Sequence, residues 1–151
     1  MSSVDATEDR KYGRRLIKAT YSLCELLADV YHPDQYEGDL KADARFLWTS
    51  LALLRALPKG MICTAISRYF CTYTAQIEER DEEFMVSGDA ESEAKKHADD
   101  DGGAKRIAAM VKLIRRLWQT DATTKEVKAE IWDSLNSVLH YSLLYTSIKA
   151  D

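Results

Sequence analysis

Residues 40–77 form the most apolar long stretch of the chain, and the turn sequence Pro58-Lys59-Gly60 divides it in two. On both sides of this turn, apolar residues recur every three or four positions, which is the spacing of one helix face. The first set is Leu40, Ala44, Leu47, Trp48, Leu51, Leu54 and Leu57, and the second is Ile62, Ile66, Tyr69, Phe70, Tyr73, Ile77 and Phe84. A short connection makes two helices antiparallel neighbours. We therefore expect helices over residues 40–57 and 61–77, folded into an apolar hairpin on which the other helices pack.

The same periodicity predicts three further helices, over residues 8–31, 104–119 and 125–148. In the first and the last of these, the apolar arc covers nearly half of the helix circumference. One neighbouring helix does not need so wide an arc. The first of these helices is therefore expected to contact two others.

Several residues predict where the helices begin and end. Pro33 ends the first helix, because the residue before a proline disfavours the α conformation. Asp39 is the expected N-cap of the second helix, and Thr123 with Glu126 is the expected capping box of the last. The acidic run 78–83 is unfavourable at the negative end of a helix dipole. The third helix is therefore expected either to end before this run or to continue well past it.

Length and composition indicate one globular domain. A chain of 151 residues matches the size of a single domain, and 46% apolar with 30% charged residues is typical of a folded protein. Six glycines and two prolines are few for an all-β protein, which needs many turns. We predict an all-α fold, a single-domain bundle or compact array of about five helices, mostly antiparallel neighbours, over residues 1–151. Residues 1–8 are expected to form a polar tail and residues 87–103 an acidic connector.

The cysteines and the apolar tracts bear on the location of the protein. Cys24, Cys63 and Cys71 are an odd set without C-x-x-C spacing, so we expect buried, reduced thiols and no disulfides. Reduced thiols favour a reducing compartment. The N-terminal residues are polar, and arginines interrupt the apolar tracts, so neither a secretory signal nor a membrane span is expected. The sequence therefore favours a cytoplasmic location, or the cytosol of a host if the protein is viral.

The first functional hypothesis is a non-enzymatic interaction or assembly protein that self-associates. The sequence has eight tyrosines and three tryptophans, and these residue types are enriched at protein interfaces. The wide apolar arcs of the first and last helices leave more apolar surface than a small bundle readily covers. Partner contacts are therefore expected on the outer faces of these two helices. The candidate interface residues are the tyrosines at the edges of the apolar stripes, namely Tyr31, Tyr36, Tyr141 and Tyr145.

The second hypothesis is binding of nucleic acid or another anionic partner through the basic helix 104–119. Its basic residues lie opposite its apolar face, and they are Lys105, Arg106, Lys112, Arg115 and Arg116. Such a face suits phosphates or an acidic protein. An ordinary solvated face explains the same pattern, and a net charge of −4 disfavours a general polyanion binder.

The third hypothesis is a Mg²⁺-dependent hydrolase of phosphate esters or nucleotides. Hard cations prefer several carboxylate oxygens, and two helices carry suitable pairs. The candidate ligands are Glu79, Glu82, Glu83, Glu130 and Asp133. A charged, solvated surface is the simpler explanation of these residues, because such pairs are common on solvated helices. The chain has no nucleophile elbow, no glycine-rich phosphate loop and no Glu-x-x-His pair, so no cofactor and no catalytic residues are predicted.

Overall fold

The computed structural model describes the backbone of residues 3–87 and 103–150, and the side chains of residues 11–87 and 106–147. The described residues are mostly helical and contain no strand, which confirms the all-α prediction. The α-helices are α1 (Ser3–Val30), α2 (Gly38–Ala56), α3 (Lys59–Thr72), α4 (Thr74–Glu78), α5 (Glu82–Ser87), α7 (Gly103–Trp118) and α8 (Lys125–Ala150). A short 3₁₀ helix, η1 (Pro33–Gln35), follows α1.

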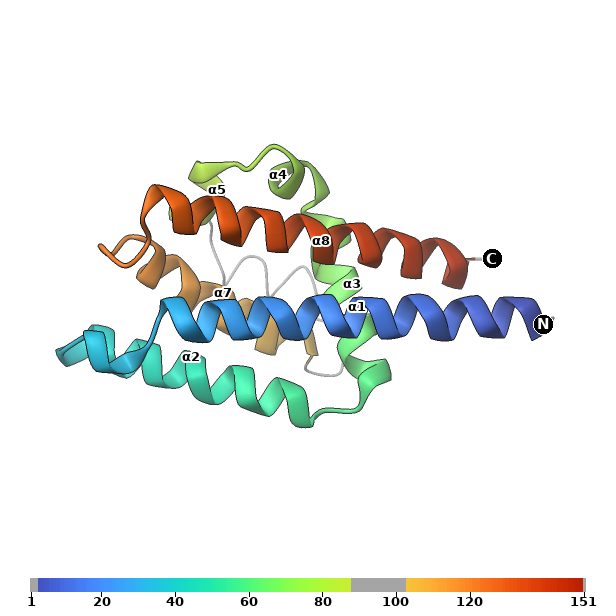
Figure 1. The fold of residues 1–151 in the computed structure, drawn as a ribbon, viewed down its shortest axis with the longest axis horizontal. Coiled ribbons are helices and arrows are strands. Elements are labelled where there is room, and N and C mark those ends of the chain that lie inside the picture. The colour runs from blue at the N-terminus through green and yellow to red at the C-terminus, as the bar shows by residue number, and fades with distance from the viewer. Residues whose placement is uncertain (1–2, 88–102, 151) are drawn as a thin grey trace.

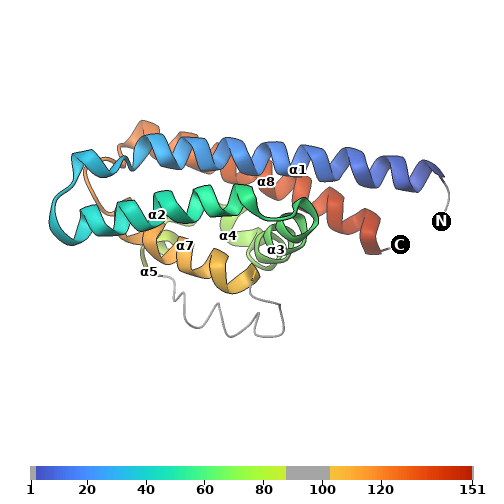
Figure 2. The ribbon, with the colours of Figure 1, turned by 90° about the horizontal axis from the view of Figure 1, so that it is seen from below.

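The helices form two layers (Figures 1 and 2). The long helices α1 and α8 lie side by side and antiparallel, and they make the most extensive helix pair of the described chain. Helices α2, α3 and α7 lie beneath them, with α2 packed against α7. The wide apolar arcs predicted for the first and last helices are thus largely covered by each other and by the second layer.

The expected hairpin of residues 40–57 and 61–77 does not form. Helix α3 crosses α1 and α8 steeply, and its main contacts are with α8, α7 and α1 (Figures 1 and 2). The cause is local, because Leu57 and Pro58 both adopt extended backbone, with ψ angles of 154° and 137°. Two extended residues redirect the chain before α3 starts, so the two apolar helices face different neighbours.

The third predicted helix, together with its alternative extension past the acidic run, is divided into three pieces. Tyr73, with φ −111° and ψ 31°, separates α3 from α4, and the chain then leaves the helix until α5 begins at Glu82. The Asp81 carboxylate accepts hydrogen bonds from the backbone N–H groups of Glu83 at 3.1 Å and Phe84 at 3.3 Å, which caps α5. The acidic run therefore ends one helix and starts another, where negative charge is favourable.

Three other boundaries differ from the predictions. Helix α1 begins at Ser3, so most of the expected tail 1–8 is helical. The cap position of α2 is Glu37 rather than Asp39, without a side-chain hydrogen bond. Thr124 rather than Thr123 caps α8, since its hydroxyl accepts a hydrogen bond from Val127 N–H at 3.2 Å. The expected connector 87–103 lies almost entirely outside the described residues.

Candidate interaction surfaces

Two of the four candidate tyrosines lie in the core. Tyr31 is 0% exposed, and its hydroxyl lies 2.9 Å from Thr123 Oγ1. Tyr36 is also buried, with its hydroxyl 3.0 Å from Thr120 Oγ1. Burial raises the pKa of Tyr31 to about 12 and also raises the pKa of Tyr36. Both residues join the α1–α2 connection to the α7–α8 loop, and neither presents a surface to a partner.

The other two tyrosines are on α8. Tyr141 and Tyr145 are half-buried, and a ring atom of Tyr145 lies 3.8 Å from a Cβ built on Gly13 of α1. Tyr145 therefore lies against the facing helix α1, and both side chains pack against the core. Among the described residues of α8, the exposed large apolar side chain is Leu143, which is 40% exposed. The described side chains of α1 and α8 therefore offer little apolar surface on the outer faces of these helices.

The exposed apolar surface is concentrated on α2 instead. Phe46 is 68% exposed and Leu53 is 55% exposed, the two highest values among the large apolar side chains that the structure describes. At 3.6 residues per turn they share one side of α2 with three small exposed residues. We define this α2 outer face as Ala42, Phe46, Thr49, Leu53 and Ala56. It lies opposite the buried stripe of Ala44, Leu47, Leu51 and Leu54.

A contact made by Trp48 closes the side of α2 that faces α1. The indole N–H of Trp48 donates to the carbonyl of Ala28 at 2.9 Å. The ring of His32 lies edge-on to Trp48, with 4.7 Å between the ring centroids. Trp48 is partly exposed, but it is held against α1 and does not belong to the α2 outer face.

The predicted basic surface of 104–119 is divided by burial. Arg115 is 4% exposed, its Nε donates to the Phe84 carbonyl at 3.0 Å, and its guanidinium lies 4.7 Å from the Phe84 ring centroid. It holds α5 against α7. Arg116 is exposed but pairs with Asp43 at 3.2 Å. Arg106 and Lys112 are exposed, and the Lys105 side chain lies outside the described residues.

A more continuous row of basic residues lies on α1. Lys11, Arg14, Arg15 and Lys18 are all exposed and follow i, i+3, i+4, i+7 spacing, which places them on one helix face. Lys59, at the start of α3, lies across a groove from this row. The spacing is visible in the sequence, but the proximity of Lys59 depends on the steep crossing of α3.

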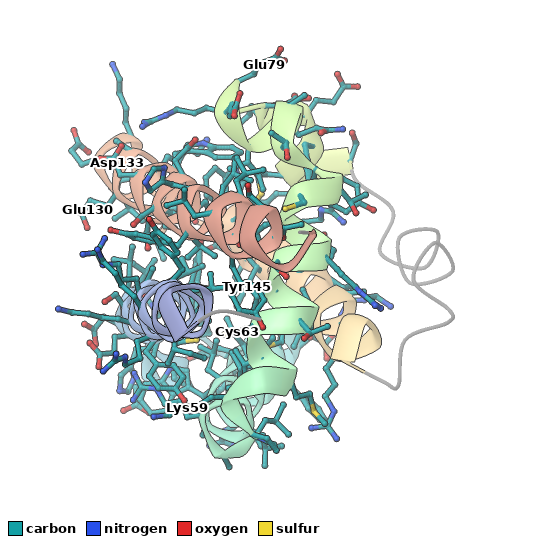
Figure 3. All side chains as sticks on the ribbon, turned by 90° about the vertical axis from the view of Figure 1, so that its right-hand side faces the viewer. Lys59, Cys63, Glu79, Glu130, Asp133 and Tyr145 are labelled. Carbon is teal, nitrogen blue, oxygen red and sulfur yellow. The ribbon has the colours of Figure 1, made fainter. Side chains whose placement is uncertain are left out.

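This groove, which we call the α1–α3–α8 groove, has a volume of about 880 Å³. Its lining includes Gly13, Arg14, Lys18, Tyr21, Lys59 and Tyr145. Figure 3 looks toward the end of the molecule where Tyr145, Cys63 and Lys59 lie. Its volume is within the range of ligand sites, roughly 300–1,000 Å³.

The candidate metal ligands do not come together. Glu82 accepts hydrogen bonds from Lys128 at 2.7 Å and from the Trp118 indole at 2.9 Å. Burial alone would raise its pKa, but these hydrogen bonds outweigh burial and the pKa is lowered. Asp133 pairs with Arg80. Figure 3 shows Glu79 well separated from Glu130 and Asp133.

The same conclusion holds for the acidic, histidine and cysteine residues that the structure describes. Among them, no group of three or more is placed to hold a metal ion. Glu83, the remaining candidate, is an exposed residue in the first turn of α5, where its charge is favourable to the helix dipole. The arrangement therefore gives the magnesium hypothesis no support.

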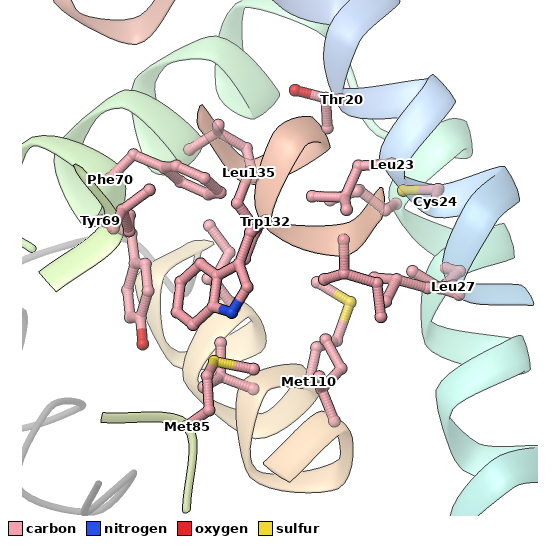
Figure 4. Close-up of a pocket in the computed structure, with 18 of the residues that line it drawn as sticks. Thr20, Leu23, Cys24, Leu27, Tyr69, Phe70, Met85, Met110, Trp132 and Leu135 are labelled. Atoms are coloured by element: carbon pink, nitrogen blue, oxygen red, sulfur yellow. The ribbon is translucent and has the colours of Figure 1, made fainter. Parts of the chain in front are cut away.

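The interior contains a small apolar cavity of about 90 Å³, lined by side chains of α1, α2, α3, α4, α5, α7 and α8 (Figure 4). Its lining includes Cys24, Met85, Met110 and Trp132. Burial raises the pKa of the Cys24 thiol to about 11. The cysteines that the structure describes are free, and Cys24 is an apolar core residue rather than a nucleophile.

Within the described ranges, no helix is both long enough and apolar enough to cross a membrane. Comparisons with protein-family models, with curated proteins and with solved structures find no match to this chain. The features of the described chain that bear on function are therefore the α2 outer face and the α1–α3–α8 groove.

Proposed function

We propose that this protein is a non-enzymatic α-helical interaction and assembly protein that self-associates through the α2 outer face. The observation that carries the proposal is the exposure of Phe46 and Leu53, at 68% and 55%, on one side of one helix. Apolar patches of this kind mark interaction sites more often than single exposed residues do. The proposal moves the partner contacts from the outer faces of the first and last helices to α2, because the apolar arcs of α1 and α8 pack on each other.

A second copy of the same helix is a suitable partner because the order of small and large residues on the α2 outer face is the same in both directions along the helix. From Ala42 to Ala56 the order is small, large, small, large, small, with Thr49 at the centre. In an antiparallel pair with a twofold axis near Thr49, Phe46 of one copy lies beside Leu53 of the other. The alanines then oppose each other and let the two backbones approach. This is the self-complementarity that a twofold interface requires.

The charges at the two ends of α2 favour the same orientation. Exposed acidic residues, Glu37 and Asp39, lie at its N-terminal end, and exposed Lys59 follows its C-terminal end. Antiparallel pairing brings each acidic end near the basic end of the other copy. Opposed helix dipoles add to the attraction, because the positive end of each helix lies beside the negative end of the other.

The expected dimer is weak. Fully burying a Phe or Leu side chain contributes roughly 1.5–3 kcal/mol. About 60% of each side chain remains exposed, so two Phe46 and two Leu53 side chains contribute about 4–7 kcal/mol. Association itself costs about 4 kcal/mol or more. Self-association should therefore depend on protein concentration, and neighbouring side chains will decide its strength.

The test is sedimentation velocity over a wide range of protein concentration. We expect the mean mass to rise from monomer toward dimer for the parent chain. Phe46→Glu and Leu53→Glu should each keep the chain monomeric, because each dimer would bury two carboxylates against apolar side chains of the other copy. Leu143→Glu is the matched control on α8, and it should dimerise like the parent. A parent that stays monomeric at the highest concentration, or a Leu143→Glu variant that alone loses dimerisation, refutes the proposal.

A cytoplasmic location is part of this proposal. Its support is the reduced state of the described cysteines, of which Cys24 and Cys63 are buried, since free thiols persist in reducing compartments.

A further inference from the structure

The α1–α3–α8 groove combines two features that occur together in sites for single-stranded nucleic acids. Such sites pair a positively charged groove, which follows the phosphate backbone, with aromatic side chains on which bases stack. Here Arg14, Lys18 and Lys59 line the groove together with Tyr21 and Tyr145. The dimerisation proposal is carried by the α2 outer face, and the two proposals share only Lys59, which follows the C-terminal end of α2 and also lines the groove.

The cations of the groove are arranged along a line. Arg14 and Lys18 line the groove, and exposed Lys11, outside the lining, continues the same face of α1. The three residues span seven positions, about 10 Å at the helical rise. A stacked strand has one phosphate per ~3.4 Å, so the row faces about three phosphates. Lys59 supplies a positive charge from the opposite wall of the groove. A strand lying along α1 would therefore have cations on both sides.

The acidic residue in the groove is already neutralised. Glu25 lines the same groove, but its carboxylate accepts a hydrogen bond from the Arg55 guanidinium at 3.0 Å. Arg55 also lies 5.3 Å from the Tyr21 ring centroid, which fixes the ring and keeps positive charge beside it. The groove is thus locally positive although the whole chain carries a net charge of −4.

The start of α3 adds backbone donors to the same wall. Helix α3 begins at Lys59 with no side-chain hydrogen bond at its cap and no acidic residue in its first turn. The first N–H groups of a helix and its dipole favour anions. Gly60, which lines the groove, has open space at the position of a Cβ, so its backbone is accessible from the groove.

We propose that the α1–α3–α8 groove binds single-stranded nucleic acid, with Arg14, Lys18 and Lys59 on the phosphates and Tyr145 beneath a base. A flat anionic membrane is a poorer fit, since the cations line a hollow and the apolar face of α1 is packed on α8. A duplex hides its bases and gains nothing from the tyrosines. This site also replaces the α7 surface, where Arg115 is buried.

The test measures fluorescence anisotropy of a labelled single-stranded RNA of mixed sequence with the full chain at low and at moderate salt. We expect log K to fall linearly with log salt, with a slope of about −0.7 for each phosphate contacted. The triple variant Arg14→Gln/Lys18→Gln/Lys59→Gln should weaken binding at least tenfold and reduce this slope. Tyr145→Leu should weaken binding roughly 5- to 150-fold, the range for one lost stacking contact.

The matched control removes the same charge from the other basic surface. Arg106→Gln/Lys112→Gln/Arg116→Gln should bind like the parent, and circular dichroism should show native helicity in every variant. Parallel arms use the duplex of the same sequence and vesicles containing anionic lipid. Absence of binding at low salt, equal losses in the two triple variants, or tighter binding to duplex or vesicles than to the single strand each overturns the proposal.

Discussion

Replacing Tyr31 tests the claim that this residue holds the C-terminal end of α1 against the C-terminal end of α7. The Tyr31 hydroxyl lies 2.9 Å from Thr123 Oγ1. The Thr123 hydroxyl donates in turn to the Leu117 carbonyl at 3.1 Å. Tyr31 and Thr123 are both buried. The two hydrogen bonds form a short chain from the end of α1 to the end of α7, with Thr123 as the shared member.

The magnitudes follow from which groups each substitution leaves without a partner. Tyr31→Phe removes one hydrogen bond while Thr123 keeps Leu117 as its acceptor, so we expect a loss of about 0.5–1.5 kcal/mol in the free energy of unfolding. Thr123→Val leaves the buried Tyr31 hydroxyl without its acceptor, and we expect about 1–3 kcal/mol. The double variant should lose less than the sum, because phenylalanine leaves no hydroxyl to satisfy.

Urea unfolding followed by far-ultraviolet circular dichroism measures all four proteins. For a domain of this size, 1 kcal/mol corresponds to roughly 2–4 °C in Tm. The control is Tyr141→Phe, which removes a hydroxyl from a half-buried tyrosine and should stay within about 0.5 kcal/mol of the parent. Full additivity of the two substitutions would show that the hydroxyls do not interact.

The pH dependence gives an independent readout of the same residue. Burial raises the pKa of Tyr31 to about 12 in the folded chain, against about 10 when unfolded. The contribution of neutral Tyr31 to the free energy of unfolding is therefore complete below pH 10 and is lost as the pH rises from 10 to 12. Two pKa units amount to about 3 kcal/mol. Tyr31→Phe should flatten this part of the profile, and a profile parallel to that of the parent would refute the reasoning.

Two further predictions concern buried side chains. Arg115→Met should lower the free energy of unfolding by about 1.5–3 kcal/mol, because it removes a buried hydrogen bond made by a charged group. Arg116→Met should lower it by only about 0–1 kcal/mol, because the ion pair of Arg116 is partly exposed. Equal shifts of the two variants in thermal unfolding would contradict this. A thiol reagent near pH 8 should modify half-buried Cys71 well before Cys24, whose pKa burial raises to about 11. Mass spectrometry measures the labelling of each cysteine. Rapid labelling of Cys24 would contradict the prediction, because it would show that the core around Cys24 opens readily.

Local sequence patterns predicted the helical class and the main helices. The periodicity of α1, α2, α7 and α8 is visible in the sequence because backbone hydrogen bonding fixes 3.6 residues per turn. Proline and acidic residues also marked real boundaries, since α1 ends before Pro33 and the acidic run 78–83 separates α4 from α5. These effects act within a few residues of the chain and need no tertiary contact.

The placement of individual side chains depended on contacts between distant residues. Tyr31 and Tyr36 lie at the edges of apolar stripes, but burial against the α7–α8 loop makes them core residues. Arg115 has the spacing of a surface cation, yet it is buried because α5 folds over it. The groove likewise exists because α3 crosses α1 and brings Lys59 opposite Arg14 and Lys18.

Helix α2 separates the two contributions most clearly. Its sequence contains two stripes at helical spacing, one through Leu47 and Leu51 and the other through Phe46 and Leu53. Sequence alone determined that both stripes belong to a helix, because helical spacing is a local property. Only the tertiary structure decided that the first stripe is buried and the second is exposed. The physical reason is that burial depends on which helices pack together, and here α2 packs on α7 and α1 through one side only.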